Sequence, residues 1–168
     1  MVVHGPAGVG KTTVLELAAP QLAATGWHVV LSRCEAEPVR PLEPIAVMVE
    51  DILSRAPTIV DDLPDPAPLT LLSPEIGHRL RGEASVRDPE RRRLERSVVE
   101  LLTHPALQPL AIVVDDLHWS TTATRGFLAA AVRTALAKGS RFAVVAGWRG
   151  ARPEDLATEA PTSFVEAL

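Results

Sequence analysis

Residues 5–12 read Gly-Pro-Ala-Gly-Val-Gly-Lys-Thr, and this short segment restricts the fold more than any other part of the chain. It matches the pattern G-x-x-x-x-G-K-[ST] at every fixed position. Glycines allow positive φ and a close approach of the backbone, so that main-chain N–H groups can surround a polyanion. Two valines typical of a buried strand precede the segment and a helical pattern follows it. This context predicts a phosphate-binding loop at the start of a helix.

The residue types in this loop predict a role for each position. Lys11 brings a positive charge to the β and γ phosphates, where it also acts in catalysis, and the Thr12 hydroxyl is a ligand for Mg²⁺. The Thr13 hydroxyl can reach the α phosphate. The residues predicted to bind the nucleotide are Gly5, Pro6, Ala7, Gly8, Val9, Gly10, Lys11, Thr12 and Thr13.

A second motif lies at residues 110–116, LAIVVDD, where a continuous apolar run ends in two acids. Such a run predicts a strand that is buried on both faces. We predict that Asp115 holds Mg²⁺, through water, and that Asp116 orients or activates the attacking water. Arg149 follows another predicted strand at 141–148, and it either contacts the γ phosphate as a third catalytic residue or lies in a surface loop.

Strands and helices are expected to alternate along the chain. The predicted strands lie near residues 2–3, 27–34, 110–116, 141–148 and 163–168, and the predicted helices at 12–24, 43–55, 88–104 and 120–139. Alternation of this kind predicts an α/β fold with three layers, in which a parallel sheet of about five strands is flanked by helices. With its phosphate loop, this is the P-loop nucleotide-hydrolase fold.

Local patterns add expectations that depend on packing. Residues 56–69 are rich in proline and aspartate and are expected to form a loop. Val14 and Leu17 in the first helix and Leu136 in the last are expected to face the core, and Ser120 to cap the last helix.

Two further segments each leave two interpretations open. The segment RDPERRRLERS is either a solvated helix face with charge pairs four residues apart or a surface that binds a partner. His118 and Trp119 either pack beneath the acid pair or face a partner.

Composition excludes several classes of protein. The net charge of −4 argues against a nucleic-acid-binding surface, because such domains are usually basic. Cys34 is the only cysteine among the 168 residues, which rules out an internal disulfide and suits a reducing compartment. No apolar run reaches the roughly 18 residues of a membrane span, and no signal peptide is evident. We therefore expect a cytoplasmic protein that contacts neither DNA nor a membrane directly.

Four segments resemble the ATPase module of large LuxR-type bacterial regulators and of related STAND and AAA signalling ATPases. They are GPAGVGKTT, RRRLERSVVELL, PLAIVVDDLHWS and FAVVAGWRGARPED. The resemblance implies that Asp115 and Asp116 form the Walker B pair and that Arg149 is the sensor arginine. At Ser120 and Thr121 the chain departs from the Ala-Asp that this family usually carries.

The resemblance covers nearly the whole chain and has consequences for organisation and function. It implies one ATPase domain over residues 1–168, truncated at both ends relative to the family. It implies ATP as the nucleotide, slow hydrolysis, and a switch between ATP and ADP forms. Its implied partners are other domains of a longer polypeptide or further copies of the module.

Two other functions remain open at the level of sequence. A P-loop kinase for small molecules would use the same loop, although no arginine-rich lid follows the acid pair. A degenerate interaction module would bind nucleotide without hydrolysing it, or bind none. The intact Lys11, Thr12, Asp115 and Asp116 argue against such decay.

Overall fold

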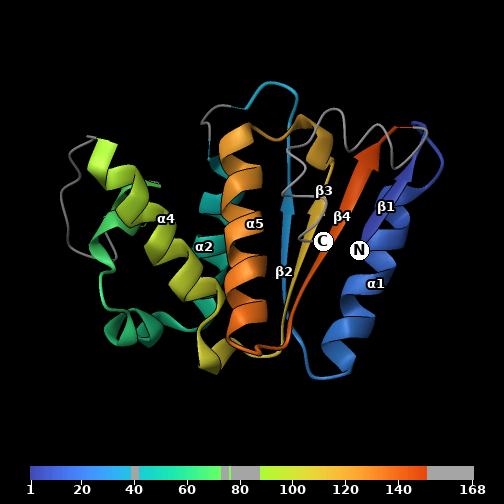
Figure 1. The fold of residues 1–168 in the computed structure, drawn as a ribbon. Helices are drawn as coiled ribbons and strands as arrows, with labels where there is room; N and C mark the ends of the chain where they lie inside the picture. Colours follow the sequence, from blue (N-terminus) through green and yellow to red (C-terminus); the bar gives the residue numbers. More distant parts are fainter. Residues whose placement is uncertain (39–41, 73–75, 77–87, 151–168) are drawn as a thin grey trace.

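A computed structural model of the chain describes residues 1–38, 42–72, 76 and 88–150. Within these residues, four strands form one parallel sheet in the order β1-β4-β3-β2 (Figure 1). They are β1 (Val2–Gly5), β2 (His28–Arg33), β3 (Leu110–Asp115) and β4 (Phe142–Arg149). The predicted strand at 163–168 lies outside the described residues, so the described sheet has four strands where about five were expected.

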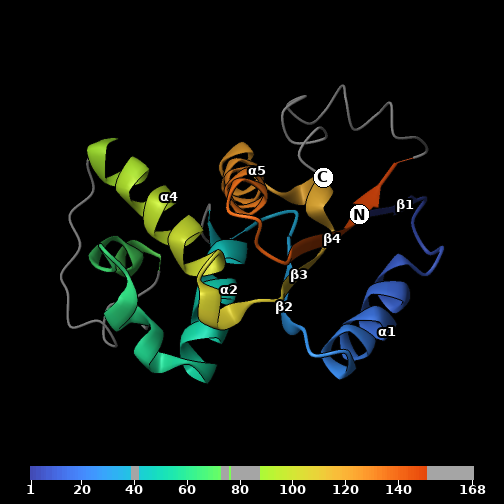
Figure 2. The ribbon, with the colours of Figure 1, turned by 60° about the horizontal axis from the view of Figure 1, so that its bottom comes forward.

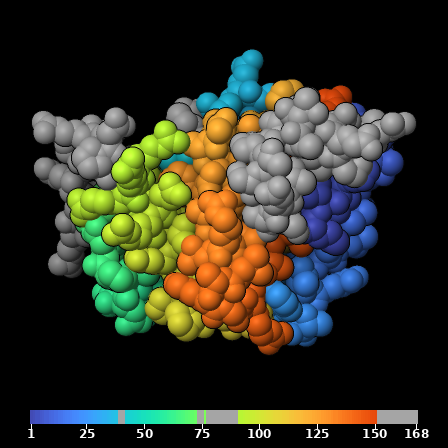
Figure 3. All heavy atoms as spheres, viewed as in Figure 1, coloured from blue at the N-terminus to red at the C-terminus, as the bar shows by residue number. Residues whose placement is uncertain are grey.

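Helices flank this sheet on both faces, as predicted. The described α-helices are α1 (Lys11–Ala24), α2 (Glu43–Arg55), α4 (Asp88–Leu102) and α5 (Thr122–Ala137). Figure 2 shows α1 on one face of the sheet and α5 on the other, with α2 and α4 beyond the β2 edge. Helix α4 packs along α5, and the two form one continuous surface (Figure 3). The α/β fold class of a P-loop nucleotide hydrolase is therefore confirmed.

The core is divided between the two faces of the sheet because successive strand residues point to opposite sides. Every residue of β3 is buried, which confirms a strand covered on both faces. On the α1 side the buried residues are Leu15, Ala19, Val29, Ala111, Val113 and Val145. Alternation places Asp115 on the same side as Val113, facing α1. The acid pair therefore lies at the end of a strand that is buried in the core.

Three expected core positions are wrong. Val14 and Leu17 are 48% and 60% exposed, because α1 touches the sheet only along a stripe that includes Leu15 and Ala19. Leu136 is 70% exposed in the last turn of α5, at the flank of that helix's buried stripe. Periodicity identified the helices correctly, but the width of each contact depends on the neighbouring elements.

Two local predictions also need correction. Residues 56–69 contain short 3₁₀ helices, η1 (Pro57–Asp62) and the start of η2 (Ala67–Leu71), because proline at the first turn of a helix is well tolerated. The cap of α5 is Thr121, whose hydroxyl accepts a hydrogen bond from the Thr124 N–H at 3.1 Å. Ser120 instead donates its hydroxyl to the Leu117 carbonyl at 2.6 Å, which closes a short turn before the helix.

The arginine-rich helix α4 forms an ion pair with another segment of the chain rather than at the predicted spacing of four residues. Arg93 of α4 pairs with Asp65 in the preceding segment at 2.8 Å. The exposed side chains of Arg91, Arg92 and Arg96 fit the predicted solvated face. None of the described helices is both long enough and apolar enough to cross a membrane.

Candidate functional site

The loop between β1 and α1 has the backbone that its glycines predict. Gly8 and Gly10 have φ values of +77° and +91°, in the left-handed region that favours glycine. A Cβ at either position would meet nothing within 4 Å among the described residues. Conformation rather than space therefore requires glycine there. Because Gly10 stands at the N-cap of α1 without a capping side chain, the first N–H groups of the helix remain able to bind an anion.

Lys11 lies at the base of this loop and is only 9% exposed. Its Nζ donates to the carbonyl oxygens of Gly5 at 3.0 Å and Pro6 at 2.9 Å. An ammonium group has three hydrogens, so these two bonds leave one that can be directed at a ligand oxygen. The loop therefore orients a positive charge toward the place where phosphate would lie.

Thr12 and Asp115 meet directly, although they are far apart in sequence. The Thr12 hydroxyl donates to Asp115 Oδ2 at 2.7 Å, and the other carboxylate oxygen, Oδ1, accepts from the Asp116 N–H at 2.9 Å. Asp115 is 9% exposed. A hydroxyl and a carboxylate are oxygen ligands of the kind that Mg²⁺ prefers. These two residues therefore fit a magnesium ion placed between the loop and β3.

Asp116 follows β3 with φ = +52°, which is uncommon for a residue other than glycine. Asparagine and aspartate tolerate this conformation best, and such residues often occur at functional sites. The residue lines a cavity of about 440 Å³ together with Lys11, Thr12 and the loop. Asp115 therefore lies on the α1 side of β3, while Asp116 lines the cavity beside the loop.

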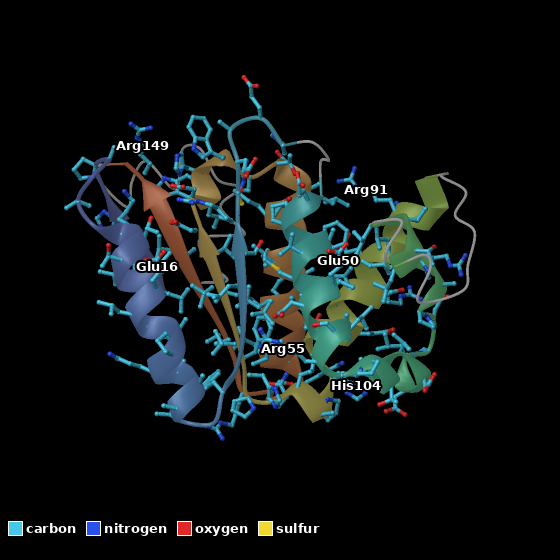
Figure 4. All side chains as sticks on the ribbon, turned by 180° about the vertical axis from the view of Figure 1, so that it is seen from behind. Glu16, Glu50, Arg55, Arg91, His104 and Arg149 are labelled. Atoms are coloured by element: carbon cyan, nitrogen blue, oxygen red, sulfur yellow. The ribbon has the colours of Figure 1, made fainter. Side chains whose placement is uncertain are left out.

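Arg149 is the last residue of β4, whereas the sequence predicted that it would follow a strand ending at residue 148. It pairs in register with Gly5 and lines the same cavity. Figure 4 shows it at the loop end of the sheet, with α1 and Glu16 below. Eight of the predicted site residues line this cavity: Ala7, Gly8, Gly10, Lys11, Thr12, Thr13, Asp116 and Arg149. Asp115 lines the neighbouring cavity, which shares Thr12 with this one. A contact between Arg149 and a γ phosphate stays a prediction.

Comparison with known proteins agrees with this geometry. The AAA ATPase domain family matches residues 1–145. This chain belongs to the AAA ATPase domain family. The matched segment includes the phosphate loop and both acids, and it ends inside β4 before Arg149. No curated protein and no solved structure matches the chain. Family membership supports nucleotide binding and ATPase activity.

Arg33 is a residue of this AAA ATPase site that sequence reasoning missed. It ends β2, and its guanidinium lies 3.4 Å from Asp115 Oδ2 and 3.4 Å from Asp116 Oδ2. The parallel register pairs Arg33 with Asp115 across β2 and β3. No local motif marks Arg33; only the order of the strands brings it to the acids.

His118 packs into the AAA ATPase domain beside the acids, which confirms the packing interpretation for this residue. Its side chain is 10% exposed, and its ring centre lies 4.7 Å from that of Trp119 and 6.3 Å from that of Trp148. Neither ring nitrogen has a hydrogen-bond partner among the described residues. Burial lowers the pKa of His118, Asp116 opposes this shift, and the positive charge of Arg149 adds to it. Trp119 is 44% exposed at the cavity wall.

Proposed function

We propose that this AAA ATPase domain binds ATP with Mg²⁺, hydrolyses it slowly, and acts as a nucleotide-dependent switch in a signalling or transcriptional regulator. The observation that carries the proposal is the hydrogen bond of 2.7 Å between Thr12 and Asp115. It joins the phosphate loop to the acid strand at the position where a metal ion would bridge them. The switch role, the slow rate and the likeness to LuxR-type regulators rest on the resemblance of the quoted segments.

The chain's own groups supply most of what phosphate binding requires. The phosphate loop and the uncapped start of α1 line the cavity, so their N–H groups are available to a phosphate there, and Lys11 adds a full charge beside them. Thr12 and Asp115 would hold Mg²⁺, which, when bound, neutralises charge on the phosphate oxygens. Asp116 lines the same cavity, where its carboxylate can orient a water molecule toward the terminal phosphate.

A binding experiment tests the phosphate loop. Calorimetric titration of ATP with Mg²⁺ into Lys11→Ala should show a loss of affinity on the order of 100-fold, because a buried charged hydrogen-bond donor is removed. Lys138→Ala is the matched control, since Lys138 also donates a hydrogen bond but contacts Thr103, away from the loop. Equal affinity in Lys11→Ala and the original chain would refute the assignment.

A rate measurement tests the acid pair. Asp116→Asn should bind ATP as the original chain does and release no inorganic phosphate, because an amide cannot accept the proton of the attacking water. If hydrolysis persists, another residue orients the water. The measurement is made without any acceptor, so phosphate release by the original chain separates hydrolysis from transfer to a small molecule.

A further inference from the structure

Gly147 occupies a confined position on β4, between the acid strand and α1. It pairs with Val3 of β1, and the register that joins Val114 to Ala146 brings it beside Asp115. A Cβ at this position would lie 2.6 Å from Asp115 Oδ1 and 3.1 Å from Leu15 Cδ1. Gly147 does not have a positive φ of the kind found at Gly8, so the lack of space, rather than the backbone conformation, requires glycine.

The carboxylate that such a methyl group would strike is held on both sides. Asp115 Oδ2 accepts from the Thr12 hydroxyl at 2.7 Å, and Oδ1 accepts from the Asp116 N–H at 2.9 Å. Leu15 is 3% exposed and packed in the core, so it can move little. The least costly response is a rotation of the Asp115 side chain, which breaks these hydrogen bonds. A side chain at position 147 would therefore remove the carboxylate from the place where it meets Thr12.

We propose that Gly147 is a positioning residue for the magnesium-binding carboxylate. Its missing side chain leaves the space in which Asp115 can face Thr12, and any larger residue turns that carboxylate away. The role in metal binding rests on the proposed function, whereas the contact between position 147 and Asp115 does not. Two measurements on the full chain separate these parts.

The first measurement is a thermal unfolding cycle without nucleotide. Gly147→Ala should lower Tm in the original chain and should lower it clearly less in an Asp115→Ala background, because the shortened side chain removes the closest contact, at 2.6 Å, while the contact with Leu15 at 3.1 Å remains. Gly126→Ala is the control, since a Cβ on Gly126 in α5 would meet no described atom within 4 Å. An equal loss of Tm from Gly147→Ala in both backgrounds would overturn the contact, and rescue of a poorly folded Gly147→Ala by Asp115→Ala would support it.

The second measurement is the Mg²⁺ concentration that gives half-maximal binding of a fluorescent ATP analogue. Gly147→Ala should raise it about tenfold, which corresponds to the loss of one charge-assisted hydrogen bond. Affinity for the analogue in EDTA should stay the same, and Gly126→Ala should change neither value. An unchanged Mg²⁺ requirement in folded Gly147→Ala would overturn the positioning role. If the original chain binds no nucleotide, the proposed function fails, and the unfolding cycle still decides the contact.

Discussion

Replacing Arg33 with glutamine should make the site bind Mg²⁺ more tightly. Arg33 places a positive charge 3.4 Å from both Asp115 and Asp116, where it neutralises part of the charge that would attract a metal ion. A dication bound at Asp115 must displace this guanidinium or accept its repulsion. Glutamine keeps much of the side-chain length and a hydrogen-bond donor but removes the charge.

The size of the effect follows from exposure. The Arg33 side chain is 60% exposed, while the carboxylate side chains of Asp115 and Asp116 are 12% and 29% exposed. Each exposed pair of this kind contributes roughly 0.2–1 kcal/mol, so the two together give about 1 kcal/mol. This corresponds to roughly a fivefold change in an equilibrium constant. The effect should shrink as salt is added, because exposed charges are screened.

The assay is the Mg²⁺ dependence of fluorescent ATP-analogue binding, with the affinity in EDTA measured separately. Comparison with the affinity in EDTA corrects for any direct effect of the Arg33 charge on binding of the triphosphate. Arg55→Gln is a matched control, since its side chain is 58% exposed and pairs with Asp51 at 2.8 Å. Figure 4 shows Arg55 toward the opposite end of the sheet from Arg149. An Arg33→Gln variant that needs more Mg²⁺, or the same amount as Arg55→Gln, would refute the reasoning.

Three further predictions concern buried or capping groups. Cys34 is only 2% exposed, and its burial raises the pKa of the thiol to about 12. A thiol reagent should therefore label Cys34 only after denaturation, and rapid labelling of the native protein would contradict this. The pKa of His118 is lower in the folded chain than its ordinary value of 6.5, so below pH 6.5 the unfolded chain binds more protons than the folded chain. The contribution of neutral His118 to stability should therefore be fully present above pH 6.5 and should be lost as the pH falls toward the folded-state pKa. His118→Leu should show a smaller decline in Tm over this pH range. Thr121→Ala should cost about 1 kcal/mol in urea unfolding, with no change arguing against the cap.

Much of the fold was predictable because its signals are local. The spacing of apolar residues identified α2 and α4, and a continuous apolar run identified β3 as a strand buried on both faces. The contacts of single residues were less predictable. Leu136 has the spacing of a buried residue but remains in solvent, and Thr121 rather than Ser120 caps α5 because the preceding turn uses the Ser120 hydroxyl. In each case a neighbouring element decides the outcome.

The amino-acid sequence by itself determined the phosphate loop and the acid pair. Their chemistry depends on residue types at fixed, short spacings, so Lys11 and Asp115 could be predicted as site residues without any knowledge of their neighbours. Only the tertiary structure decided which other residues share their edge of the sheet. Arg33 reaches the acids and Gly147 makes room for one of them because a parallel sheet brings together the carboxyl ends of strands that are distant in sequence.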